Sequence, residues 1–278
     1  MTIFDARICG LGEGALWHPL REQLFWFDIL GKRMLSTDGQ DWDFDEMVSA
    51  AGWVDHDTLL IASETALSTF NLITCACETV TLLEPDNRVT RSNDGRADPM
   101  GGFWIGTMGK GAEPGAGAIY RLYKGELRLM YPQITIPNAM CFAPDGRTGY
   151  FTDTATQIVN RVALDAQGWP NAAPEPFIDF RAKDLNPDGA VTDAAGNLWI
   201  ALWGAGRIAV FDPQGNPQHA VALPAPHITC PAFAGTTLYA TSATQGMDAA
   251  ALALHPDAGK TFAIPTAAMG RPEPQVIL

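Results

Sequence analysis

Long apolar runs are missing from this sequence of 278 residues. No stretch approaches the ~18 apolar residues that a membrane helix needs. The opening segment, MTIFDARICGLGEG, contains neither the basic region nor the apolar segment of a secretory signal. The sequence therefore favours a globular protein of the cytoplasm without membrane association. A hydrophobic content of 47% is enough for one large core or two smaller ones.

Cysteine and positive charge are both scarce. The five cysteines are odd in number and scattered along the chain: Cys9, Cys75, Cys77, Cys141 and Cys230. Because Cys75 and Cys77 lie too close in sequence for an easy disulfide, we expect reduced, buried thiols. With 31 acidic and 18 basic residues the net charge is −13, and no local cluster of Lys or Arg offsets it. This charge repels a phosphate backbone, which argues against a nucleic-acid partner.

Familiar catalytic motifs are absent as well. The five histidines show no H-E-x-x-H or H-x-H spacing, which argues against a histidine-rich zinc site. No G-x-S-x-G motif of a serine hydrolase is present, and no glycine-rich nucleotide loop, so no organic cofactor is expected. His18 lies close to Glu13 in sequence, but a packing role in a turn is the simpler interpretation.

What the sequence does contain is a repeat. Short apolar triplets with aromatic or β-branched character begin at residues 25, 60, 104, 150, 199 and 239, most of them after a turn. Their spacing of about 40 residues suits four strands per unit, and the 27 Gly and 20 Pro interrupt any long helical pattern. We therefore predict an all-β fold: a six-bladed β-propeller with four-stranded blades and a central channel, forming a single domain over residues 1–278. A pair of β-sandwiches is the alternative, but sandwiches do not repeat at ~40 residues.

One position of this repeat carries polar residues. Eleven or twelve residues ahead of four triplets, the chain has an acid or an amide: Glu13, Asn93, Asn138 and Asp188. The other two units, at residues 49–53 and 229–233, offer no carboxylate there. Equivalent repeat positions should converge at one end of the channel, where such groups would be costly to bury without a divalent cation. Each residue alone also fits an ordinary turn, so the shared position is what favours a metal site.

Five motifs carry a family resemblance. In chain order they are LGEGALWHP (11–19), RSNDGRADPMGGFWIGTMG (91–109), IPNAMCFAPDGRTGYFTDT (136–154), NPDGAVTDAAGNLWIALWG (186–204) and GRPEP (270–274). Their order and spacing resemble the senescence marker protein/regucalcin/gluconolactonase family from about residue 8 to the end. The resemblance implies a six-bladed propeller that binds one divalent cation in its channel and hydrolyses sugar lactones.

The resemblance also implies roles for particular residues. The implied metal ligands are Glu13, Asn138 and Asp188, and the implied substrate contacts are Arg91, Asn93 and Glu113. For Arg91 the alternative is a pairing with a surface acid. Glu113 belongs to a glycine-rich loop at residues 109–118, where a solvated carboxylate is the alternative.

The expected reaction follows from these roles. A Ca²⁺, Zn²⁺, Mn²⁺, Mg²⁺ or Fe²⁺ ion would polarise the carbonyl of an aldono- or uronolactone and activate a bound water, whose proton Asp188 would accept. Gly189 would let the chain pass close to the ion. Four tryptophans near the polar positions could line a sugar pocket, although blade packing is expected for most of them: Trp17, Trp104, Trp199 and Trp203. Two alternatives are a propeller whose ion is structural or regulatory, and a hydrolase of other esters such as organophosphates.

Overall fold

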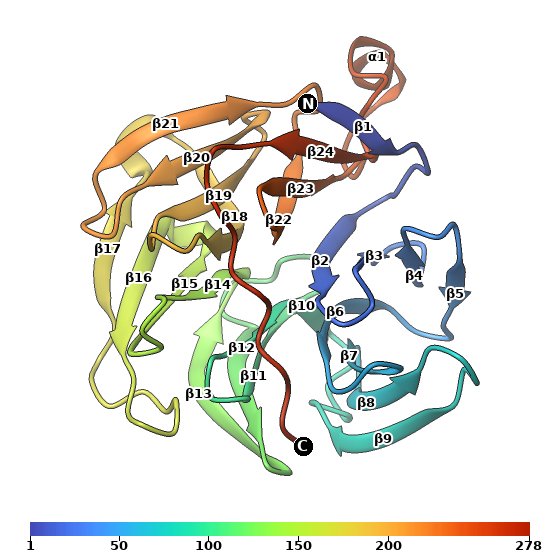
Figure 1. The fold of residues 1–278 in the computed structure, drawn as a ribbon, viewed down its shortest axis with the longest axis vertical. Coiled ribbons are helices and arrows are strands. Elements are labelled where there is room, and N and C mark those ends of the chain that lie inside the picture. Colours follow the sequence, from blue (N-terminus) through green and yellow to red (C-terminus); the bar gives the residue numbers. More distant parts are fainter.

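The computed structural model describes all 278 residues. It contains six antiparallel sheets of four strands each, which encircle an axis as blades (Figure 1). The six-bladed β-propeller expected from the repeat is therefore confirmed. Each of the six apolar triplets of the repeat lies in the second strand of its blade, one strand away from the axis.

Five blades follow one another along the chain, each running from its innermost to its outermost strand. The first is β2 (Gly12–His18), β3 (Gln23–Asp28), β4 (Arg33–Ser36) and β5 (Asp41–Asp43). The second is β6 (Val48–Trp53), β7 (Thr58–Ser63), β8 (Ala66–Asn71) and β9 (Cys77–Leu82). The third is β10 (Thr90–Ala97), β11 (Phe103–Gly109), β12 (Gly117–Tyr123) and β13 (Glu126–Ile134). The fourth is β14 (Pro137–Phe142), β15 (Thr148–Asp153), β16 (Ile158–Ala163) and β17 (Glu175–Asp179). The fifth is β18 (Asn186–Thr192), β19 (Leu198–Trp203), β20 (Arg207–Phe211) and β21 (Pro217–Ala222).

The sixth blade joins the two ends of the propeller. Its strands are β22 (Ile228–Ala234), β23 (Thr237–Ser242), β24 (Thr261–Pro265) and β1 (Thr2–Asp5). Strand β1 pairs antiparallel with β24, with Thr2 opposite Ala263. A strand from near the N-terminus thus closes the ring by hydrogen bonding. The only α-helix, α1 (Ala249–Leu254), interrupts this blade between β23 and β24; short 3₁₀ turns occupy Thr154–Thr156 and Arg181–Lys183.

Burial falls from the axis to the rim. All residues of the inner strand β14 are buried, whereas the outermost strand β9 is largely exposed. Aromatic side chains fill the space between blades: Trp104 packs edge-on against Phe142 at 5.4 Å, and Trp199 against Phe233 at 5.4 Å. Trp17 of the first blade stacks on Tyr239 of the sixth at 5.8 Å. Three of the four tryptophans therefore serve blade packing, as expected.

The inner strands share an irregularity. Each loses register with its neighbour in the same stretch, at Glu13–Leu16, Val48–Ala50, Ser92–Gly95, Asn138–Cys141, Pro187–Ala190 and Ile228–Pro231. Such β-bulges bend a strand and redirect its side chains. The polar position of the repeat therefore coincides with the bulge of each inner strand.

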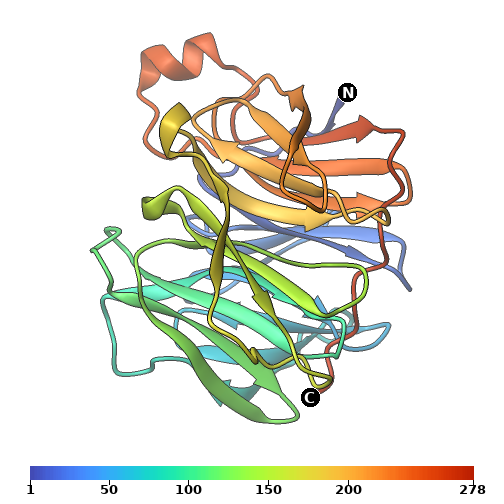
Figure 2. The same cartoon turned by 90° about the vertical axis from the view of Figure 1, so that its left-hand side faces the viewer.

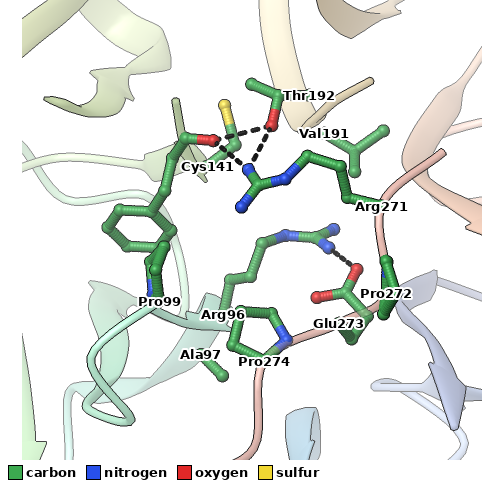
Figure 3. Close-up of a pocket in the computed structure, with 11 residues that line it drawn as sticks. Arg96, Ala97, Pro99, Cys141, Val191, Thr192, Arg271, Pro272, Glu273 and Pro274 are labelled. Carbon is green, nitrogen blue, oxygen red and sulfur yellow. Dashed lines mark hydrogen bonds and ion pairs between the residues drawn. The ribbon is translucent and has the colours of Figure 1, made fainter. Parts of the chain in front are cut away.

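The C-terminal residues 266–278, which we call the strap, cross one end of the channel (Figure 1), on the face opposite to α1 (Figure 2). Backbone bonds of 2.8 Å fasten the strap to three blades: Gly270 N–H to Gly235 O, Val276 N–H to Trp53 O, and Ile277 N–H to Gly101 O. Inside the strap, Glu273 forms an ion pair with Arg96 of β10, and Arg271 lies beside it (Figure 3). We call this end of the channel the strap end and the other the site end.

The cysteines differ in part from expectation. All five are free, and Cys9, Cys141 and Cys230 are buried as predicted. The prediction is wrong for Cys75 and Cys77, which are exposed, because β9 is the outermost strand of its blade and Cys75 lies in the turn before it. No helix in the structure has the length and apolar character needed to span a membrane.

Candidate active site

A cavity of about 560 Å³ opens at the site end of the channel. Five residues singled out from the sequence line it together: Glu13, Arg91, Asn93, Asn138 and Asp188. They come from four different inner strands, β2, β10, β14 and β18, and meet because the repeat gives each strand the same direction and the same bulge. The expected convergence at one end of the channel is thus observed.

A chain of hydrogen bonds links three of these strands around the cavity. Arg91 Nη1 donates to Asn93 Oδ1 at 2.8 Å, and Asn93 Nδ2 donates to Asn138 Oδ1 at 3.0 Å. Asn138 Nδ2 then donates to Thr154 Oγ1 at 2.9 Å, and this hydroxyl donates to Pro187 O at 2.7 Å. The direction of the chain is fixed at both ends, because a guanidinium can only donate and a carbonyl can only accept.

The fixed direction distinguishes the two amides. The Asn138 amide must point its oxygen away from Thr154, because its nitrogen donates to that hydroxyl. The bond from Asn93 occupies only one of the two lone pairs of the Asn138 oxygen. The second lone pair remains for a ligand. In Asn93 both amide hydrogens are occupied, by Asn138 Oδ1 and by Pro137 O, each at 3.0 Å. The Asn93 oxygen also keeps one lone pair, but it accepts from the positively charged Arg91, which disfavours a cation there. Asn138 is therefore the better candidate cation ligand, and Asn93 orients it.

Glu13 and Asp188 are buried carboxylates without an ion-pair partner. They are 5% and 4% exposed, and neither forms a salt bridge. Burial, followed by the charge of Asp94, raises the pKa of Glu13 to about 8. Burial, followed by the charge of Glu13, raises the pKa of Asp188 well above its usual range. Two acids held this way fit a divalent cation, which would relieve both the desolvation and the repulsion.

Arg91 is a positive charge that acts on both of these acids. Burial lowers the pKa of its guanidinium to about 10, against the opposing effect of Glu13. Within the protein only Nη1 is engaged, with Ser92 O and with Asn93 Oδ1. The other N–H groups remain for a ligand in the cavity. The surface-pair alternative is thereby excluded, because Arg91 is buried and forms no salt bridge.

Glu113 lies beside the cavity rather than in it. The preceding residues Lys110, Gly111 and Ala112 line the wall, but the Glu113 carboxylate turns back and accepts the Gly111 N–H at 3.1 Å. Lys110 is also engaged, in an ion pair with Glu64. Substrate contact by Glu113 stays a prediction.

A glycine is needed at position 189 for a different reason from the one expected. Its φ is not in the left-handed region, so no special backbone conformation requires a glycine. A side chain there would instead meet the next inner strand, since an added Cβ would lie 2.8 Å from Thr229 O and 2.9 Å from Cys230 Cα. The glycine lets β18 approach β22 closely. The proposed role of easing passage beside an ion is therefore not needed.

Two further residues of the cavity wall make informative contacts. The Thr154 hydroxyl accepts the hydrogen bond from the Asn138 side chain. Thr154 is the last residue of the sequence motif 136–154, but only the fold reveals this contact. Trp203 forms a wall and stacks on His227, with ring centroids 4.1 Å apart and planes 5° apart. Of the four tryptophans, Trp203 alone lines the cavity.

The fold and the site together define a class of protein: a six-bladed propeller with an oxygen-rich, cation-compatible pocket at one end of its channel. The chain belongs to the SMP-30/gluconolactonase/LRE-like family, whose model matches residues 11–244. The resemblance drawn from the five motifs is confirmed.

Similar proteins match nearly the whole chain. The L-arabinolactonase of Azospirillum brasilense is 36% identical over 268 residues, which cover 92% of this chain and 88% of the relative. The pentonolactonase of Haloferax volcanii is 31% identical over 278 residues, covering 95% and 94%. The solved structure of a calcium-binding protein, regucalcin, from Agrobacterium tumefaciens is 38% identical and superimposes with a TM-score of 0.97, covering 99% of this chain and 97% of that one.

Proposed function

We propose that this protein hydrolyses an aldono- or uronolactone to the sugar acid in a reaction that depends on a divalent cation. Relatives that cover nearly the whole chain are named lactonases, which makes this chain a hydrolase of lactone esters. The observation that best supports a cation is that two buried carboxylates without ion-pair partners, those of Glu13 and Asp188, line the same cavity as the oriented Asn138 oxygen.

Glu13, Asn138 and Asp188 would hold the ion. When bound, a divalent cation supplies Lewis-acid polarisation of the lactone carbonyl and stabilises the oxyanion that develops there. Carboxylate and amide oxygens suit Ca²⁺, Mg²⁺ and Mn²⁺, and Zn²⁺ or Fe²⁺ can also occupy such a site according to supply. The name of the regucalcin neighbour supports Ca²⁺ as one candidate.

Asp188 is the candidate general base. Its carboxylate would accept a proton from water as the water oxygen bonds to the lactone carbonyl carbon. The ring C–O bond then breaks, and the proton passes to the departing ring oxygen, which becomes a hydroxyl. Water is thus added across the ester, and the product is an open-chain hydroxy acid.

Substrate recognition would fall to Arg91 and Asn93. The free N–H groups of Arg91 can donate to ring hydroxyls or to a uronate carboxylate. Because both amide hydrogens of Asn93 are occupied, it can only accept a bond, through the second lone pair of its oxygen. Trp203 offers an apolar face to the sugar ring. Glu113 would take part only after its loop opens, since its carboxylate is bonded to Gly111.

The test is hydrolysis of a panel of aldono- and uronolactones by metal-stripped protein, with and without each ion. We expect loss on chelation and recovery with at least one ion. Asp188→Asn should abolish recovery. The matched control is Asp193→Asn, since Asp193 is also buried but bonds Trp199 and the backbone away from the cavity. Equal hydrolysis by stripped and loaded protein would refute the cation dependence.

A cation-binding protein without hydrolytic activity is the second candidate, favoured by the description of the regucalcin neighbour as calcium-binding. The same samples separate the two candidates. Cation binding measured by calorimetry, without turnover of any lactone or of a phosphotriester panel, would support binding alone. Turnover of phosphotriesters but not of lactones would indicate another esterase.

A further inference from the structure

Asp94 is a buried carboxylate next to the proposed site that no role above uses. It follows Asn93 inside the bulge of β10 and is 4% exposed. Its Oδ2 accepts the backbone N–H of Met140 from the neighbouring blade at 2.9 Å. A buried carboxylate is costly, and Asp94 forms no salt bridge, so its bond to a backbone N–H of the neighbouring blade needs a reason.

The bond reaches the bulge that carries Asn138. Strand β14 pairs with β15 at Asn138 and again at Cys141, and the two residues between them are left out of the register. Ala139 adopts a left-handed conformation with φ of 56°, which is unfavourable for a residue with a side chain. The local geometry next to Asn138 therefore depends on support from outside its own sheet.

Consecutive residues of β10 hold both sides of Asn138. On one side, Asn93 Nδ2 donates to Pro137 O and to Asn138 Oδ1, each at 3.0 Å. On the other, Asp94 receives Met140 N–H. Asn138 thus lies between two backbone groups, Pro137 O and Met140 N–H, that are held by side chains of a different blade.

We propose that Asp94 is a positioning residue that fixes the Asn138 oxygen for cation binding, through its bond to Met140 N–H. This inference rests on the proposed function, in which Asn138 is a ligand. Asp94 also lies close enough to Glu13 and Asp188 for its charge to act on both, and Arg96 acts on Asp94 from the other side. The two contributions, hydrogen bond and charge, can be separated by substitution.

The experiment measures Mn²⁺ affinity of metal-stripped protein by calorimetry, which needs no enzymatic activity. Asp94→Ala removes the hydrogen bond and the charge, and we expect about a 10- to 100-fold weaker Kd, as for other groups that orient metal ligands. Asp94→Asn removes the charge but keeps an acceptor oxygen for Met140 N–H, and it should recover most of the affinity. Lactone hydrolysis by Asp94→Ala should be weak at low Mn²⁺ and recover at saturating Mn²⁺.

The control is Asp193→Ala, which removes a buried carboxylate that bonds backbone N–H groups far from Asn138. It should lower the melting temperature without changing the Kd for Mn²⁺. Should Asp94→Ala not fold, Asp94→Ser replaces it, since the shorter side chain loses reach to Met140 but stays polar.

The outcomes separate this inference from the proposed function. Unchanged Mn²⁺ affinity in Asp94→Ala or Asp94→Ser would overturn the positioning role and leave the cation site intact. Equal losses in the asparagine and alanine variants would overturn positioning by the hydrogen bond, since charge alone would explain them. Wild-type protein that binds no Mn²⁺, Ca²⁺ or Zn²⁺ would overturn the cation site and, with it, this inference.

Discussion

The two ends of the channel bury charge in opposite ways. At the strap end, Arg96 pairs with Glu273, and Arg121 pairs with Asp98 at 2.6 Å with both side chains fully buried. At the site end, Glu13 and Asp188 are as deeply buried but form no ion pair. The same inner strands contribute to both ends, since β10 carries the cavity residue Arg91 and the paired Arg96.

The difference separates structural charges from functional ones. A buried charge with a well-placed partner is retained because losing that partner is costly. A buried charge without a partner destabilises the fold, so it is typical of a site that binds a ligand or performs chemistry. The strap contributes to this difference, because it brings Glu273 to Arg96 at its end of the channel (Figure 3).

The largest expected effect comes from Asp188→Asn. As a lost general base and ligand, it should reduce kcat for lactones by at least ~10²-fold. In metal-stripped protein the same change should raise the melting temperature, because a buried, repelled carboxylate is replaced by a neutral amide of the same shape. Steady-state kinetics and calorimetry measure the two effects. A melting temperature that falls would mean that Asp188 is a structural charge after all.

Glu273→Gln should act in the opposite direction on stability. It leaves Arg96 buried without its carboxylate, which costs about 3–5 kcal/mol. Chemical denaturation measures the loss. The double variant Arg96→Met with Glu273→Gln should recover most of it, because the unpaired charge is then gone. A single variant as stable as wild type would show that the pair contributes nothing at the strap end.

Cation binding should stabilise the protein through residues of the site end alone. An ion at 100 times its Kd raises the free energy of unfolding by about 2.7 kcal/mol. Glu13→Gln should lose this increment, since it removes one of the three proposed ligands, whereas Glu273→Gln should keep it. Denaturation with EDTA and with Ca²⁺ or Mn²⁺ gives both values. An increment that survives in Glu13→Gln would place the ion elsewhere.

The repeat explains why the sequence predicts one end of the channel better than the other. Glu13, Asn93, Asn138 and Asp188 share a repeat position, and a closed propeller must bring equivalent positions together. Contacts outside the repeat have no such signal. The pairing of Trp53 Nε1 with Glu273 O spans 220 residues of sequence.

Local packing hides other features from the sequence. The contacts of Thr154 and Asp94 depend on how one blade lies against the next. The close approach of β22 to Gly189 depends on it as well. In the Glu113 loop, the Glu113 carboxylate accepts the backbone N–H of Gly111, a contact that no pattern of residue types specifies.

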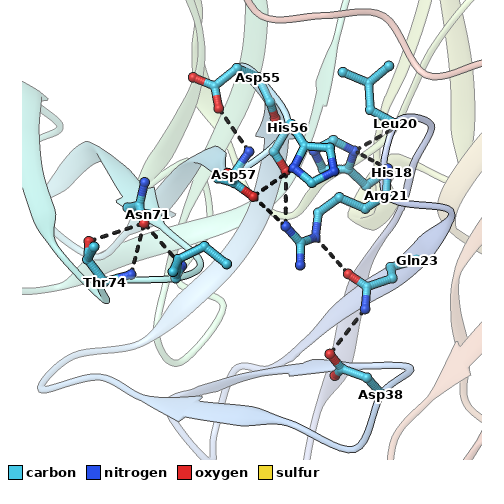
Figure 4. Close-up of polar contacts among 11 residues, drawn as sticks. His18, Leu20, Arg21, Gln23, Asp38, Asp55, His56, Asp57, Asn71 and Thr74 are labelled. Carbon is cyan, nitrogen blue, oxygen red and sulfur yellow. Dashed lines mark hydrogen bonds and ion pairs between the residues drawn. The ribbon is translucent and has the colours of Figure 1, made fainter.

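The smallest expected effect comes from His18, at the strap end of β2, where both ring nitrogens have hydrogen-bond partners. Its Nε2 bonds Asp55 O at 2.9 Å, while Nδ1 accepts the N–H groups of Leu20 and Arg21 at 3.3 and 3.4 Å (Figure 4). This pattern requires the neutral ring with its proton on Nε2, because a protonated Nδ1 could no longer accept. Burial accordingly lowers the pKa of His18 below its usual 6.5.

Because the folded state takes up this proton less readily than the unfolded chain, the stability that neutral His18 contributes is full above pH ~6.5 and is lost as the pH falls below it. His18→Gln should reduce the loss of melting temperature between pH 7.5 and pH 5. This change in stability should be smaller than those expected for the Asp188, Glu273 and Glu13 variants. The same change at the exposed His56, which bonds Asp57 at 2.7 Å in the adjacent turn, is the control (Figure 4). An acid-induced loss that His18→Gln leaves untouched would mean that the His18 ring takes up a proton as readily in the folded protein as in the unfolded chain. The neutral hydrogen-bond pattern, and with it the contrast between the two ends, would then need revision.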